Sequence, residues 1–105
     1  MTGGTANPSR GEAAIVVDGA PRKLRPSFDA LVRAEEELGP LFALVERAGE
    51  GQLRLAEIAG LFWHCLADQA SVRREAVGDA VVAMGLAEAA GPLRMLLGEI
   101  LRGRG

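Results

Sequence analysis

The sequence predicts a mainly α-helical protein: a short N-terminal β-hairpin followed by about five short helices in a small bundle. Three observations predict it. The chain has 105 residues, the usual size of a single domain. Its apolar residues include only three Phe, one Trp and no Tyr, so Leu, Val, Ile and Ala must build the core, which favours packed helices over a β-sandwich. From residue 27 onward, apolar residues recur at helical spacing.

The charge balance and the single cysteine limit the class of protein. Twelve basic and fourteen acidic residues are interspersed, without the basic stripe that gives nucleic-acid affinity. Cys65 alone cannot form an internal disulfide, and no apolar run approaches the roughly 18–20 residues of a membrane span. We therefore expect a cytoplasmic protein with no nucleic-acid partner and no membrane contact. Residues 1–9 are expected to form a flexible tail and residues 10–102 a single domain.

Residues 12–25 predict the hairpin. The apolar run Ala13–Val17 suits a short strand, and residues 22–25 are expected to pair back on it. Between them, Asp18-Gly19 is the strongest dipeptide signal for a tight turn, because glycine tolerates a positive φ. A two-stranded hairpin is barely stable alone. We therefore expect its apolar side chains to rest on the helices: Ile15, Val17 and Leu24.

Five helices are expected, over residues 27–38, 41–49, 54–69, 72–84 and 86–102. Ser27 can cap the first helix, which ends at Gly39, and glycines within 49–51 break the second. The third helix is the most hydrophobic. Ser71 can cap the fourth, and Gly85 stops it.

Apolar stripes indicate which helix faces are buried. The first helix carries a stripe at helical spacing that is apolar at four of five positions: Phe28, Leu31, Val32, Glu35 and Leu38. The fifth carries a wide apolar stripe: Leu93, Leu96, Leu97, Ile100 and Leu101. Pro92 must kink this last helix or begin it again, because proline lacks the N–H and clashes one turn back.

No set of residues carries recognisable chemistry. His64 stands between Trp63 and Cys65, but adjacent helical residues point about 100° apart and cannot form a Cys–His nucleophile pair. A metal site needs further His or Cys ligands, which the chain lacks. We interpret this segment as a core cysteine beside a partly exposed histidine and a half-buried tryptophan. The sequence thus assigns no catalytic, metal-binding or cofactor-binding residue and no small-molecule substrate.

Two charged groups could face a partner. Glu35-Glu36-Glu37 lies near the C-terminus of the first expected helix, where acids oppose the helix dipole, and a basic residue from a partner would relieve this. A small basic patch on the hairpin could bind an acidic partner or could equally protect the strand edges from mispairing. Its members are Arg10, Arg22, Lys23 and Arg25.

A helix-turn-helix across the third and fourth helices is a further alternative. Arg73 and Arg74 would stand at the start of its recognition helix. The rest of that helix, residues 75–81, offers two acids and little that can read base edges. This mismatch disfavours DNA binding.

The N-terminal motifs, taken in order, resemble one known family. Asn-Pro-x-Arg-Gly-Glu, a short apolar strand, Asp-Gly-x-x-Arg-x-Leu-Arg and a helix with Ala-Leu-x-x-x-Glu closing in Glu-Leu-Gly resemble the gene transfer agent family of small phage-tail proteins. Ser27 stands where that family usually has threonine, which keeps the capping hydroxyl. The matching residues are Asn7, Pro8, Arg10, Gly11, Glu12, Asp18, Gly19, Arg22, Leu24, Arg25, Ala30, Leu31, Glu35, Glu37, Leu38 and Gly39.

The resemblance implies a non-enzymatic protein, since members are described as tail tube proteins or tail assembly chaperones. One short hairpin and about five helices fit a chaperone better, because tube proteins use β-sandwich or barrel cores with long pairing hairpins. A chaperone's partner would be the tape measure protein or another tail protein, and self-association is a further expectation. The alternatives are a structural tail component (tube or connector) and a small helical DNA-binding regulator. Candidate partner-binding residues are Glu35, Glu36, Leu93, Leu97, Ile100 and Leu101.

Overall fold

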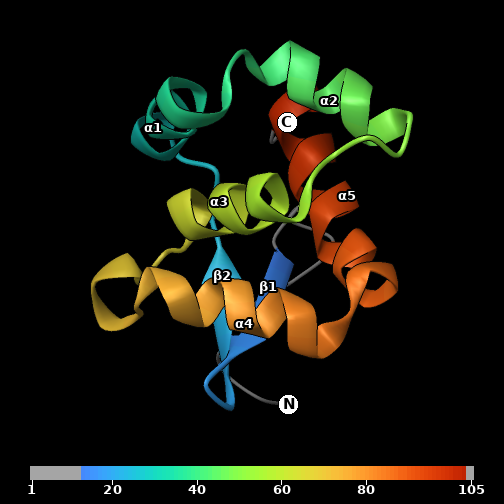
Figure 1. Ribbon diagram of the computed structural model, residues 1–105. Coiled ribbons are helices and arrows are strands. Elements are labelled where there is room, and N and C mark those ends of the chain that lie inside the picture. The colour runs from blue at the N-terminus through green and yellow to red at the C-terminus, as the bar shows by residue number, and fades with distance from the viewer. Residues whose placement is uncertain (1–12, 104–105) are drawn as a thin grey trace.

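The computed structural model describes residues 13–103 and confirms the predicted fold class, an N-terminal two-stranded hairpin followed by five helices (Figure 1). The expected tail and three residues of the family pattern, Arg10, Gly11 and Glu12, lie outside the described residues. The elements are β1 (Ala13–Val17), β2 (Ala20–Leu24), α1 (Phe28–Leu38), α2 (Leu41–Gly49), α3 (Leu55–Cys65), the 3₁₀ turn η2 (Gln69–Ser71), α4 (Arg74–Met84) and α5 (Leu86–Arg102).

The hairpin has the tight turn that the sequence predicts. β1 and β2 are antiparallel, and Val17 pairs with Ala20 across a two-residue turn. Asp18 and Gly19 have φ angles of 52° and 78°, the left-handed pair that a type I′ turn requires. β2 therefore begins at Ala20 rather than at residue 22, because pairing starts directly after so short a turn. The three apolar side chains expected to face the helices are buried: Ile15, Val17 and Leu24.

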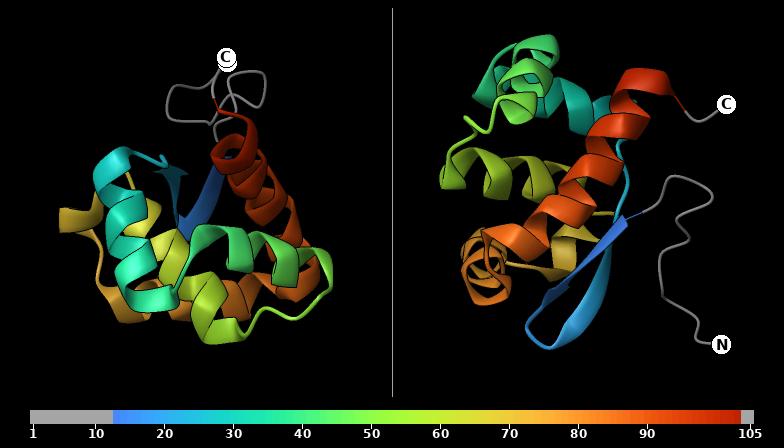
Figure 2. Two further views of the ribbon diagram at one scale, coloured as in Figure 1. Left: turned by 90° about the horizontal axis from the view of Figure 1, so that it is seen from above. Right: turned by 90° about the vertical axis from the view of Figure 1, so that its right-hand side faces the viewer.

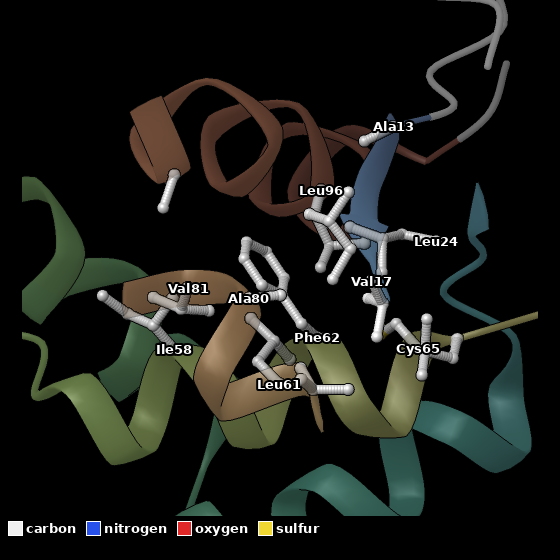
Figure 3. Close-up of a cluster of buried hydrophobic side chains, with 14 of the residues drawn as sticks. Ala13, Val17, Leu24, Ile58, Leu61, Phe62, Cys65, Ala80, Val81 and Leu96 are labelled. Carbon is white, nitrogen blue, oxygen red and sulfur yellow. The ribbon is translucent and has the colours of Figure 1, made fainter. Parts of the chain in front are cut away.

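The helices lie in layers around the hairpin. In Figure 1, α1 and α2 lie at one end of the molecule, α3 lies beneath them, and α4 and the hairpin lie at the other end. α5 crosses from the α4 end to the α2 end, as the right view in Figure 2 shows. The main core lies between α3, α4, α5 and β1, where Phe62 projects among Leu96, Val17 and Ala80 (Figure 3).

Helix α3 is shorter than the predicted 54–69, since it ends at Cys65. Beyond it the chain turns into an extended segment along β2: Leu66 forms a β-bridge with Leu24. The N–H of Arg25 donates to the carbonyl of Cys65, and the N–H of Ala67 donates to the carbonyl of Lys23. Pairing with the outer edge of β2 thus replaces the last expected turn of the helix.

Helix α4 begins later than the predicted residue 72. Ser71 belongs to η2 instead of capping α4, Val72 is extended and buried, and Arg73 is the N-cap residue. The reason is that Val72 contributes its side chain to the core from the connection before the helix. Helix α5 runs through Pro92 without beginning again. Gly91 precedes that proline and brings no Cβ into the usual clash.

The prediction that the apolar stripe is the buried face of α1 is wrong in part. Phe28 is 81% exposed and Val32 37%, whereas Ala30 and Ala34 are buried. Small side chains let α1 approach α3 closely, and α3 presents Gly60 at the contact. A Cβ on that glycine would lie 3.4 Å from Leu38 Cδ2. Close packing through alanines therefore prevails over burial of the larger aromatic ring.

Candidate partner-binding groove

An open groove lies between α2 and α5. It consists of two adjoining depressions that share Val45 and Leu101. The smaller, of about 210 Å³, is lined by Glu35, Leu41, Phe42, Val45, Ile100 and Leu101. The larger, of about 620 Å³, is lined by Val45, Ala48, Gly49, Ala90, Leu93, Arg94, Leu97, Gly98, Leu101 and Arg102. We call the two together the α2–α5 groove.

The groove exposes large apolar side chains to water. Phe42 is 76% exposed and Leu101 55%. Leu93 and Ile100 are half-buried, and Leu97 at the floor is buried in the core. A contiguous apolar surface rimmed by charged residues is the usual form of a protein–protein contact site.

The structure brings together five of the six predicted partner-binding residues. Glu35, Ile100 and Leu101 line the smaller depression. Leu93 and Leu97 line the larger one, again with Leu101. Glu36 is exposed on α1 and lines neither depression. Contact of these residues with a partner stays a prediction.

Sequence reasoning missed nine residues of the groove, four of which are Phe42, Val45, Arg94 and Arg102. Phe42 and Val45 come from α2, and Phe42 carried a usable signal. It follows Leu41 directly and therefore falls outside the apolar stripe of its helix, which leaves a large ring in water. Arg94 and Arg102 of α5 are the other two, and their spacing of two helical turns places both on one face.

Polar contacts hold α2 beside the groove. Arg47 of α2 binds both carboxylate oxygens of Glu57, with N–O distances of 2.8 and 2.7 Å. The same carboxylate accepts the N–H of Arg54 at 2.9 Å. These bonds, first that from Arg47, lower the pKa of Glu57 to about 2. At the other end of α2, Glu35 Oε2 accepts the N–H of Leu41 at 3.1 Å, which satisfies a donor of the first turn.

Basic residues of the same chain partly offset the unfavourable negative charge of the acidic run on α1. His64 Nε2 lies 2.7 Å from Glu37 Oε1, and the guanidinium of Arg74 donates to Glu37 Oε2. The hydrogen bond from Arg74, and then that from His64, lower the pKa of Glu37 to about 2. No partner protein is needed to supply a cation to this carboxylate. Arg74, considered above as a possible DNA contact, is thus bound to Glu37.

The residues of the family pattern within β1 and β2 and around them form the hairpin turn or join the hairpin to the rest of the fold. Arg22 Nη1 lies 3.6 Å from Asp68 Oδ2, in the segment after α3. Leu24 is in the core, and the backbone of Arg25 bonds to Cys65. Asp18 and Gly19 form the turn.

Cys65 lies inside the protein, and burial raises the pKa of its thiol to about 12. The nucleophilic thiolate is therefore not formed at neutral pH. Across residues 13–103, no three His, Cys, Asp or Glu side chains gather as a metal site would require. Within the same residues, no single helix is long and apolar enough to cross a membrane. α4 and α5 reach that length and composition only as a pair, and they are bent by 118° to each other.

Comparison with known families gives a match over most of the chain. Residues 10–103 match the model of a family described as phage tail tube protein, GTA-gp10. Neither a curated protein nor a solved structure matches the chain significantly.

Proposed function

The chain belongs to the phage tail tube protein (GTA-gp10) family, and on this premise we propose that it acts as a tail assembly chaperone. It holds apolar helical segments of the tape measure protein in the cytoplasm and gives them up as tube subunits assemble. The proposal includes no catalytic step. The observation that carries it is the open apolar α2–α5 groove, in which Phe42 and Leu101 are exposed to water.

A groove between two helices suits a helical client. An amphipathic helix can lay its apolar face in such a groove, with side chains at i, i+3, i+4 and i+7 as anchors. Burial of Phe42 and Leu101 against that face contributes roughly 25 cal/mol per Å² of apolar surface removed from water. The same contact covers the client's apolar residues and so keeps it from aggregating.

The small sheet supports a chaperone over a tube subunit. β1 and β2 have five residues each, and the described part of the chain contains no other named strand. A tube wall built on sheet pairing calls for longer strands. Helical surfaces, in contrast, make up most of residues 13–103.

Coexpression with the tape measure protein tests the proposal. We expect the wild-type chain to copurify with that protein and to raise its soluble fraction. The double variant F42D/L101D places charges in the groove at two exposed positions, so it should fold and yet lose the client. The control is F28D, because Phe28 is about as exposed as Phe42 and lies outside the groove.

The chaperone proposal is wrong if the wild-type chain neither copurifies with the tape measure protein nor improves its solubility. It is also wrong as a groove mechanism if F42D/L101D binds as well as the wild type. Circular dichroism of both variants shows whether they keep the fold.

A structural tail component is the second candidate, favoured by the free edge of β1. The outer edge of β2 is covered by residues 65–67, and Pro21 on that strand offers no N–H. The register of the hairpin directs the backbone groups of Ala14 and Val16 to the other edge, where no described residue pairs with them. A neighbouring subunit could add a strand there. A structural component would be found in purified particles, whereas a chaperone would be absent from them.

A further inference from the structure

The larger depression of the α2–α5 groove has two arginines along one rim. Arg94 and Arg102 are both exposed, and both line this depression. They stand eight positions apart on α5, hence about 12 Å apart along the helix axis and on the same face. In the described part of the chain, no acidic side chain lines the same depression. The rim on the α5 side is therefore positively charged.

Neither arginine forms an ion pair within residues 13–103. Gly98 lies midway between them, and the guanidinium of Arg102 lies over it: a Cβ at this glycine would come within 2.8 Å of Arg102 Nη2. The two cations thus border the apolar surface with their charge available to a ligand.

Small residues shape the floor between these cations and α2. Ala48 and Gly49 end α2 and Ala90 lines the same depression from α5, whereas Gly98 is covered by the guanidinium of Arg102. Small side chains at a helix contact let a second backbone come close. Apolar anchors flank this shallow track, with Leu93 and Leu101 on α5. The small and apolar residues along this track suit one face of an additional helix.

We infer that the α2–α5 groove selects an amphipathic helix whose apolar face is bordered by acidic side chains about two turns apart, which pair with Arg94 and Arg102. The inference rests on the proposed function, since it specifies which segments of the tape measure protein are held. Apolar burial supplies most of the affinity. The two arginines make the groove selective among client helices and fix the position of the client along it. Opposite charges at the rim of an interface act chiefly on specificity and association rate.

Two synthetic amphipathic helical peptides test this selectivity. They share one leucine-rich apolar face, and their flanks carry either Glu or Lys at two positions two turns apart. Fluorescence anisotropy of each labelled peptide against the full chain gives the two affinities. At low salt we expect the Glu peptide to bind about tenfold more tightly than the Lys peptide, since each exposed charge pair contributes modestly and like charges repel. The ratio should fall as salt is added.

Charge reversal at the rim identifies the residues responsible. In R94E/R102E the preference should invert, so that the Lys peptide binds more tightly. The matched control R33E/R73E reverses two other exposed arginines that line neither depression, and it should keep the preference for Glu. Circular dichroism checks that both variants fold.

The inference is overturned if the two peptides bind equally or not at all, or if R94E/R102E keeps the preference of the wild type. This result is separable from the chaperone test. If the tape measure protein copurifies but the peptides bind equally, the function stands and the acidic selectivity is wrong. If the peptides are distinguished but the tape measure protein does not copurify, the selectivity stands and the client is wrong.

Discussion

At the scale of single residues, Glu37 joins three helices through one carboxylate. It lies in the last turn of α1, accepts a hydrogen bond from Arg74 of α4, and contacts His64 of α3. An acid at this position is unfavourable for an isolated helix, because it faces the negative end of the dipole. The two partners lower the pKa of Glu37 from 4.5 to about 2, which shows that the folded protein favours the charged form. The carboxylate therefore stabilises the fold only while it is ionised.

Glu37→Gln tests this contribution. The carboxyl group has a lower pKa folded than unfolded, so its stabilisation is complete above about pH 5 and is lost as the pH falls from 4.5 toward 2. At pH 7 we expect E37Q to lower the free energy of unfolding by about 0.5–1 kcal/mol, the range for a partly exposed pair. The difference from wild type should shrink on acidification. Urea titrations between pH 7 and pH 3 measure it.

The neighbouring variant E36Q is the control for that series. Glu36 is exposed and has no ion pair with the described residues, so its loss should leave stability unchanged at every pH. A gap between E37Q and wild type that persists undiminished at pH 3 contradicts the assignment.

Two glycine-to-alanine changes should act in opposite directions. Gly19 has a φ of 78° in the hairpin turn, so a Cβ is strained there although no atom lies nearby. We expect Gly19→Ala to destabilise the protein by about 1–2 kcal/mol. Gly78 lies inside α4 with open space around it, and Gly78→Ala should stabilise by about 0.5–1 kcal/mol. Urea midpoints of the two variants test this. Equal midpoints would refute the account of the turn.

At the scale of elements, α2 is the helix held least by the core. Leu44 is its one fully buried side chain, and it lies outside the main core cluster. The Arg47–Glu57 pair joins α2 to the first turn of α3. Glu57 is mostly buried and also accepts the N–H of Arg54, so three hydrogen bonds converge on one carboxylate. One wall of the α2–α5 groove therefore depends on this ion pair for its position.

Arg47→Met should loosen α2 without unfolding the rest. The methionine keeps much of the apolar stem but makes no hydrogen bond to Glu57. We expect the amides of residues 41–49 to exchange with solvent faster, whereas those of α4 keep their protection. Hydrogen exchange followed by mass spectrometry separates the two segments. The control is R54M, because Arg54 binds Glu57 through its backbone N–H, which the substitution preserves. Equal acceleration in α4 would show global unfolding and contradict the prediction.

The sequence predicts these elements well where the signal is local. The hairpin turn follows from Asp18-Gly19, and the cap of α1 from Ser27, whose hydroxyl accepts the N–H of Ala30 at 3.2 Å. Prediction from the sequence fails where contacts between residues far apart in the chain determine the structure. No local pattern reports that Leu66 pairs with Leu24, and this bridge ends α3 early. Residues of the groove were found from the stripe on α5, but its second wall required knowing where α2 lies.

At the scale of the whole molecule, stability depends on one core assembled from every layer. Phe62 of α3 is completely buried, with side chains of β1, α4 and α5 around it (Figure 3). A domain of this size buries a smaller share of its surface than a larger domain does, and its total free energy of unfolding is of the order of 5–15 kcal/mol. The groove adds exposed apolar surface that contributes nothing to that total until a partner covers it. Removal of one central side chain therefore costs a large fraction of the total free energy of unfolding.

Phe62→Ala and Phe28→Ala compare the same chemical change at two extremes of burial. Phe62 is 0% exposed, and its truncation should cost about 3–5 kcal/mol through lost burial and a cavity, enough to leave the domain marginally folded. Phe28 is 81% exposed although it falls on the apolar stripe of α1, so its truncation should change stability by less than about 0.5 kcal/mol. Thermal unfolding of the pair measures the difference. If Phe28→Ala were as harmful as Phe62→Ala, α1 would bury the face that its periodicity predicts, and the close alanine contact with α3 would be wrong.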